Sequence, residues 1–85
     1  MGEEIIITQK IRYSKELGGN LRSLRIKVGL TQEETVIKME LMGCKTTREI
    51  YSQMEMGVYN IRINELKALK EIFHTSYDRI FESYK

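Results

Sequence analysis

Side chains that can form several hydrogen bonds are concentrated in residues 46–55, which read TTREIYSQME. Arg48 donates through a planar fork, and Gln53 both donates and accepts, so each can hold a planar polar partner by two hydrogen bonds. The chain contains no nucleophile motif, glycine-rich phosphate loop or metal-ligand spacing. This pattern predicts a binding surface. We expect no enzymatic activity, cofactor, metal or small-molecule substrate.

A capped helix precedes this segment and helps to position it. Thr31 and Glu34 have the spacing of a capping box, in which each side chain accepts a hydrogen bond from the other residue's backbone N–H. The helix that begins there ends at residues 43–45, where glycine breaks the pattern. Its expected buried stripe consists of Thr35, Val36, Met39 and Met42.

The hydrogen-bonding segment itself is predicted to form the next helix. Thr46 or Thr47 caps its N-terminus, and Gly57 ends it. Tyr51 and Met54 lie three residues apart and are expected to face inward. The side chains at the start of this helix are therefore left facing outward.

Three further helices are predicted to support this pair. Residues 15–28 form a helix that ends at Gly29, and Ser76 caps a short last helix. Residues 58–62 form the loop between the helix that ends at Gly57 and the helix that begins near Ile63. The buried positions expected on these helices are Leu17, Leu21, Leu24, Val28, Ile63, Leu66, Leu69, Ile72, Phe73, Tyr77, Ile80, Phe81 and Tyr84.

Length and composition favour one small domain in a reducing compartment. The chain has 85 residues and a net charge of +2, and its single cysteine, Cys44, cannot form a disulfide within the chain. No stretch approaches the about 20 apolar residues of a membrane span. We expect an N-terminal arm over residues 1–14, irregular or strand-like at Ile5–Ile7, a domain over 15–85, and a cytoplasmic location.

The charge of the chain is unevenly distributed. Residues 20–62 carry seven lysines and arginines against five acids, whereas the segments on either side are balanced. This excess of positive charge lies over the predicted helix pair. It favours binding to phosphates, although an ordinary solvated surface explains the charges equally well.

The motifs together resemble the Cro/C1-type (Xre) helix-turn-helix family of repressors. The resemblance covers about residues 17–81. Three features depart from the family pattern: a longer stretch between Met39 and Thr46, Val36 in place of a small alanine, and Ile50 in place of a hydroxyl. The matching residues are Leu24-Arg25, Gly29–Glu34, Thr46–Arg48, Gln53–Glu55, Gly57 and Ser76–Phe81.

The resemblance implies an all-α, compact five-helix, lambda-repressor-like fold. It also implies a function: a regulator, most simply a repressor, that binds a palindromic double-stranded DNA operator as a homodimer through the helix beginning near Thr47. The alternative is an antitoxin or co-regulator that binds a protein partner, with DNA binding secondary or lost. Neither reading involves a membrane.

By position and resemblance, the side chains that would read bases lie at the start of the third helix. Arg48 suits guanine and Gln53 suits adenine. Arg48 can instead be a solvated arginine, and Glu49 can either accept from cytosine or complete a capping box with Thr46. The predicted base-reading residues are Thr47, Arg48, Glu49, Ser52 and Gln53.

A second group of residues is expected to contact the DNA backbone or to hold the recognition helix. For the backbone group, phosphate contact and plain solvation are both open. Arg25 and Glu55 are expected to form an ion pair that fixes the third helix. The predicted backbone-contacting residues are Thr31, Gln32, Lys45, Tyr59, Asn60 and Arg62.

Overall fold

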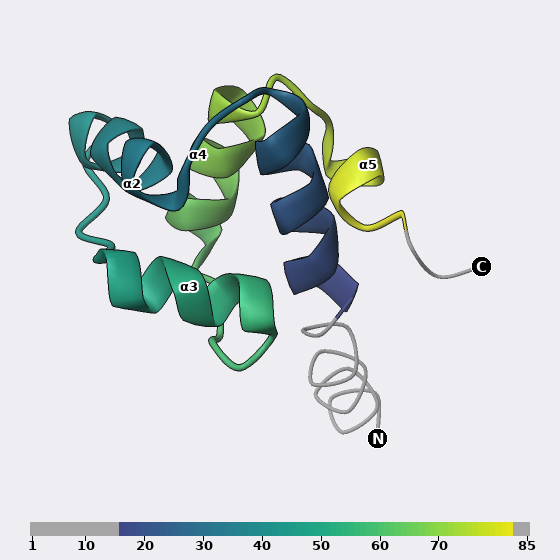
Figure 1. Cartoon of the computed structure of the whole chain (residues 1–85), viewed down its shortest axis with the longest axis horizontal. Helices are drawn as coiled ribbons and strands as arrows, with labels where there is room; N and C mark the ends of the chain where they lie inside the picture. Colours follow the sequence, from purple (N-terminus) through teal and green to yellow (C-terminus); the bar gives the residue numbers. More distant parts are fainter. Residues whose placement is uncertain (1–15, 83–85) are drawn as a thin grey trace.

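Five helices follow one another in residues 16–82, the part of the chain that the computed structural model describes, and no strand occurs among them (Figure 1). The first helix covers residues 16–27 and is called the N-terminal helix below. The others are α2 (Gln32–Leu41), α3 (Arg48–Met56), α4 (Ile63–Ile72) and α5 (Tyr77–Ile80). The all-helical class predicted from the sequence is confirmed. The predicted arm, residues 1–14, and Tyr84 lie outside the described residues.

The ends of α2 and α3 coincide with the capping residues expected from the sequence. The Thr31 hydroxyl accepts from the Glu34 N–H, and the Glu34 carboxylate accepts from the Thr31 N–H, which completes the capping box of α2. Gly57 ends α3 at a φ of 78°. That left-handed conformation is accessible to glycine because it has no Cβ. The boundaries of the central helix pair are thus set by local chemistry.

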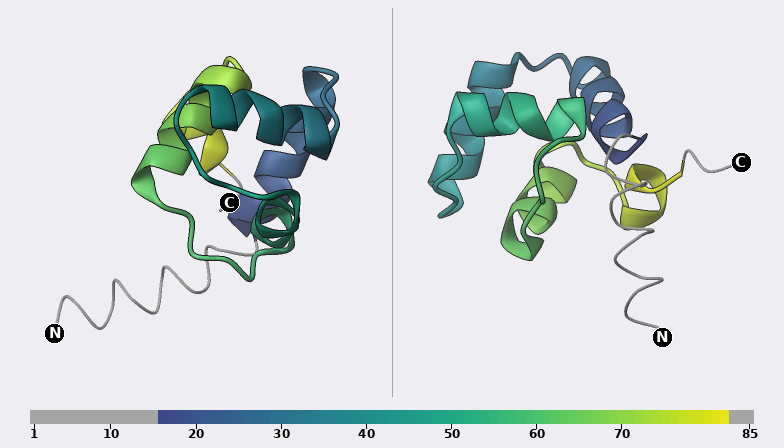
Figure 2. Two further views of the ribbon diagram at one scale, coloured as in Figure 1. Left: turned by 90° about the vertical axis from the view of Figure 1, so that its left-hand side faces the viewer. Right: turned by 90° about the horizontal axis from the view of Figure 1, so that it is seen from below.

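The N-terminal helix, α2, α3 and α4 enclose a core to which α3 contributes one face. Figure 1 shows α4 between α2 and the N-terminal helix, and Figures 1 and 2 show α5 beside the N-terminal helix. α2 packs against both α3 and α4. The largest fully buried side chains are Tyr51, Phe73, Leu21, Met39, Met54, Leu69, Ile80 and Thr35.

Two close contacts dock the N-terminal helix. A Cβ added at Gly18 would lie 2.5 Å from the carbonyl oxygens of Met54 and Glu55, so the helix backbone rests directly on the end of α3. On another side, Asn20 donates to the carbonyl of Ile80, the last residue of α5, at 2.7 Å. The N-terminal helix therefore joins α3 to α5.

Several expected core positions are exposed instead. Met42 lies just past α2, and Ile63, which is 74% exposed, begins α4. Tyr77 and Phe81 are also partly exposed at the two ends of α5. All four predictions were wrong for one reason: helical spacing assigns a residue to a face, but no element within residues 16–82 fully covers that face at the helix ends. Among the described helices, none combines the length and apolar character needed to cross a membrane.

Candidate recognition surface

The first turn of α3 points away from the core. Thr47, Arg48, Glu49 and Gln53 are exposed, and Ser52 is half-buried. The opposite side of the same helix carries the buried Tyr51 and Met54. The structure therefore leaves all five predicted base-reading side chains at least partly accessible, and four of them, Arg48, Glu49, Ser52 and Gln53, line one hollow.

The capping of α3 excludes one of the two roles considered for Glu49. The hydroxyl of Thr47, rather than Thr46, accepts the hydrogen bond from the Ile50 N–H at 3.1 Å. The expectation that Glu49 completes a capping box with Thr46 was therefore wrong. With Thr47 as the cap, the Glu49 side chain lies on the exposed first turn of the helix.

A buried ion pair holds the C-terminal half of α3. Arg25 Nε donates to Glu55 Oε2 at 2.7 Å and Arg25 Nη2 donates to Glu55 Oε1 at 3.2 Å, and the two side chains are only 11% and 4% exposed. The pair expected from the sequence is therefore present. Arg25 Nη1 also donates to the Leu30 carbonyl at 2.8 Å, so one guanidinium joins the N-terminal helix, the following turn and α3.

Gln32 extends this network to the start of α2. Its Nε2 donates to Glu55 Oε1 at 3.0 Å. We call Arg25, Gln32 and Glu55 the Glu55 network. Because an amide nitrogen carries two hydrogens, Gln32 retains one donor for another acceptor. The network fixes the angle of α3 against both preceding helices.

Burial and hydrogen bonding shift the pKa of Glu55 in opposite directions. Burial would raise the pKa of this carboxyl, but hydrogen bonds, first of all from Arg25, hold it below its ordinary value. The neighbouring Tyr51 hydroxyl is buried, and among the described residues it has no partner in good hydrogen-bonding geometry. Its burial and the Glu55 carboxylate raise the pKa of Tyr51, so the phenol stays neutral. The ionised pair is therefore the dominant charge at this end of α3.

A second buried carboxylate, Glu65, holds the segments on either side of α3. Thr46 Oγ1 donates to Glu65 Oε2 at 2.6 Å, the Tyr59 hydroxyl lies 3.4 Å from the same oxygen, and the Arg62 N–H donates to Oε1 at 2.9 Å. We call Thr46, Tyr59, Arg62 and Glu65 the Glu65 network. The sequence reasoning missed it. The only signal was a glutamate at the third position of a helix, where a side chain can cap the backbone.

Cys44 lies beside the Glu65 network and is buried. Its thiol donates weakly to the Asn64 carbonyl at 3.7 Å. Burial, and then the negative charge of Glu65, raise the pKa of this thiol. Since the thiolate is the reactive form, the geometry fits a packing role for Cys44.

The predicted backbone-contacting residues surround α3 but do not all have free side chains. Thr31, Lys45, Asn60 and Arg62 are exposed. The hydroxyl of Tyr59 is instead directed at Glu65 within the protomer. A hollow lined by Thr31, Gln32 and Arg48, among others, places the start of α2 beside the start of α3.

A second shallow hollow lies on α3 itself. It is lined by Gln32, Arg48, Glu49, Ser52, Gln53, Met56 and Val58. Five of these side chains are polar and two are apolar. Met56 and Val58 were not among the residues singled out from the sequence, although they lie three and five residues after Gln53.

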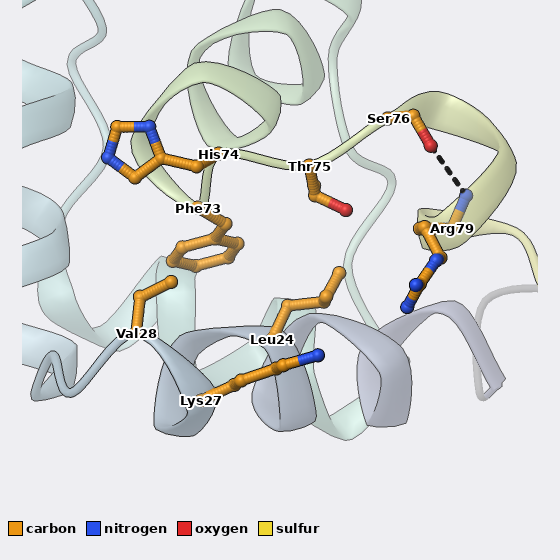
Figure 3. A pocket seen from close by; sticks show the side chains of 8 residues that line it. All are labelled: Leu24, Lys27, Val28, Phe73, His74, Thr75, Ser76 and Arg79. Carbon is orange, nitrogen blue, oxygen red and sulfur yellow. Dashed lines mark hydrogen bonds between the residues drawn. The ribbon is translucent and has the colours of Figure 1, made fainter.

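Figure 3 shows a further hollow, between the N-terminal helix and the turn joining α4 to α5. Leu24, Val28 and Phe73 form its apolar side, and Lys27 and Arg79 project beside it. Both cations are exposed, and Arg79 lies 3.9 Å from the Glu82 carboxylate. Among the described residues, none of the buried polar side chains, Thr35, Thr46 and Glu65, lines this hollow.

The fold and the site define an all-helical domain that presents the polar first turn of one short helix to solvent. Comparisons of the chain with protein-family models, with curated proteins and with solved structures found no match.

Proposed function

We propose that this protein is a sequence-specific, double-stranded DNA-binding transcriptional regulator of the helix-turn-helix class. In this proposal α3 enters the major groove and its first turn contacts base edges. α2 lies across the DNA backbone, as the first helix of such a pair does. The protein would act as a repressor on a palindromic operator, with one copy of the chain on each half-site.

The observation that carries the proposal is the two-sided character of α3. Arg48 and Gln53 are exposed on its outer side, while Tyr51 and Met54 anchor its inner side in the core. Arginine suits the two acceptors of guanine, and glutamine suits adenine, each through two hydrogen bonds. A rigidly held helix with such side chains free at its start is what base reading requires.

The start of α2 supports the same arrangement. Thr31 and Gln32 lie beside Arg48, and Gln32 retains a donor after its hydrogen bond to Glu55. Donors at a helix N-terminus suit a phosphate oxygen, which only accepts hydrogen bonds. A phosphate contact there would set the register of α3 without adding sequence information of its own.

The test is selection of bound duplexes from a random pool, followed by gel shifts on the selected site. We expect one dominant site with two-fold symmetry and half-sites about 34 Å apart. Arg48→Ala should weaken binding and relax the preference at one base pair, by about 1–3 kcal/mol of discrimination. Selection of no preferred duplex would contradict the proposal.

Lys67→Ala is the matched control for Arg48→Ala. Lys67 is an exposed cation on α4 and lines a hollow with Met42 and Tyr77, none of which lines the hollow on α3. If Arg48 acts by reading a base, only Arg48→Ala changes the sequence preference. If both variants lose affinity equally on every duplex, Arg48 contributes only general charge.

A second candidate function, binding of a protein partner, is favoured by one observation. Ile37, Leu41 and Met42 leave apolar side chains exposed along α2 and just beyond it. Met42 lines two hollows beside α4, and Leu41 lines one of them. Contiguous exposed apolar side chains are typical of protein contacts.

Light scattering separates a contact between two copies of the chain from a contact with another protein. If Leu41→Ser converts a dimer to a monomer and weakens operator binding, the apolar surface is the contact between the two copies of the proposed regulator. If the wild type is a folded monomer without DNA binding, the partner-binding function is favoured instead.

A further inference from the structure

Two apolar side chains continue the predicted reading surface beyond Gln53. Met56, the last residue of α3, is 63% exposed, and Val58 is 67% exposed. Both line the same hollow as Arg48, Ser52 and Gln53. The reading surface therefore has an apolar part next to its hydrogen-bonding part.

Helical spacing places Met56 in line with the predicted reading side chains. Ser52 and Met56 lie four residues apart, as do Arg48 and Ser52, and residues at this spacing share one face of a helix. Met56 therefore extends the row that begins at Arg48. Its exposure follows from this row, since the other side of α3 is the buried one.

The turn after α3 fixes Val58 beside Gln53. The Val58 N–H donates to the Gln53 carbonyl at 3.1 Å and the Gly57 N–H donates to the Met54 carbonyl at 3.1 Å. This is the hydrogen-bond pattern of a Schellman motif, in which the residue after the glycine usually packs against an apolar partner on the helix. Here the residue at the partner position on the helix is the polar Gln53, so the Val58 side chain is left largely uncovered.

The major groove offers one apolar group to such side chains. Each base pair presents hydrogen-bonding atoms there, and thymine adds its C5 methyl group. Contact of that methyl with exposed apolar surface removes both from water. Hydrogen bonds from Arg48 and Gln53 cannot sense this methyl, whereas Met56 and Val58 can.

We propose that Met56 and Val58 contact a thymine methyl group, at or next to the base pair that Gln53 contacts. They would be specificity-determining residues that make the half-site require thymine at that position. The inference rests on the proposed DNA-binding function, because it concerns how the same surface distinguishes bases.

The test replaces each thymine of the selected duplex with uracil, one position at a time. Uracil lacks only the methyl group, so hydrogen bonding is unchanged. We expect one substitution per half-site to weaken binding about fourfold, the factor that corresponds to burial of about one methyl or methylene group. Fluorescence anisotropy with labelled duplexes measures this difference.

Protein variants connect the effect to these two residues. Met56→Ala and Val58→Thr should bind the thymine and uracil duplexes with equal affinity, while Ile63→Ala should keep the fourfold difference. Ile63 is an exposed apolar residue outside this hollow, which makes it the matched control. Thermal unfolding should be nearly unchanged, since all three side chains are exposed.

Three outcomes separate the inference from the proposed function. Failure to select any preferred duplex overturns the function and the inference together. Specific binding with no effect of uracil at any position overturns only the inference. A uracil effect that persists unchanged in both Met56→Ala and Val58→Thr also overturns it, because another group then senses the methyl.

Discussion

Glu55 and Glu65 are both buried carboxylates that hold α3, yet they are satisfied in different ways. Glu55 accepts hydrogen bonds from the Arg25 guanidinium and from Gln32, so its charge is paired. Glu65 accepts from Thr46, Tyr59 and the Arg62 N–H, and all three donors are neutral groups. Removing one charge of a buried ion pair leaves the other charge unpaired and costs a large free energy of unfolding. Removing one of several neutral donors to a carboxylate costs less, because the other donors remain.

The two networks also act on different parts of the candidate surface. The Glu55 network holds α3 itself against the N-terminal helix and α2. The Glu65 network holds Thr46, directly before α3, and Tyr59, in the loop after it. Together they leave the first turn of α3 free while fixing its position, which is the arrangement that recognition requires.

The largest effect is expected from breaking the ion pair. Arg25→Met leaves the buried Glu55 carboxylate without its cation, and it should lower the free energy of unfolding by about 3–5 kcal/mol. Adding Glu55→Leu should recover much of that loss, because an apolar pair needs no compensation. Urea denaturation of the single and double variants measures both values. An equal or greater loss in the double variant would contradict this account of the pair.

Acid should weaken the Glu55 network by a smaller amount, since a protonated carboxyl retains part of its hydrogen bonding. The pKa of Glu55 is lower in the folded chain than its ordinary value of 4.5. Its ionised form therefore stabilises the fold at pH above 4.5, and this contribution is lost as the pH falls below 4.5. Thermal unfolding of wild type and Glu55→Gln should converge as the pH drops from 7 to 3. A difference that stays constant over that range would show that Glu55 does not titrate in this way.

Breaking one neutral donor of the Glu65 network should cost less than breaking the ion pair. Thr46→Val keeps the shape of the side chain but removes the hydroxyl, and it should lower the free energy of unfolding by about 1–3 kcal/mol. Thr46→Ser retains the hydroxyl and is the control for its loss. A penalty from Thr46→Val as large as that from Arg25→Met would remove the distinction between the two networks.

Two neighbouring glycines of the N-terminal helix should respond with opposite signs, and the change at Gly19 is the smallest effect expected. Gly18→Ala would force its Cβ against the carbonyl oxygens of Met54 and Glu55, at a cost of about 1–3 kcal/mol. Gly19 has nothing within 4 Å of an added Cβ, so Gly19→Ala should stabilise the helix by about 0.5–1 kcal/mol. Chemical denaturation of the two variants measures the contrast. The same sign of change in both would contradict the close approach at Gly18.

The sequence predicts the local features of this structure well. Thr31, Glu34 and Gly57 determine the helix ends through hydrogen bonds or backbone conformation within a few residues. Tyr51 and Met54 follow from helical spacing. The Arg25–Glu55 pair was expected from family resemblance rather than from the residues alone, because it joins positions 30 apart in the chain.

The features that the sequence did not predict depend on contacts between distant segments. Glu65 is buried because residues 46, 59 and 62 supply its donors together. Met42 and Ile63 occupy apolar positions of a helical pattern but remain exposed, because the pattern does not show where a neighbouring helix ends. Gly18 is required only because α3 passes against it. Such positions need the packing of the whole fold.

Selection of duplexes with Gln53→Ala, compared with wild type, tests the central claim that α3 reads bases from its exposed side. The account predicts that the variant selects the same operator with relaxed preference at one base pair in each half-site, and unchanged preference elsewhere. Identical selected sites for both proteins, or no preferred duplex for either, would contradict it.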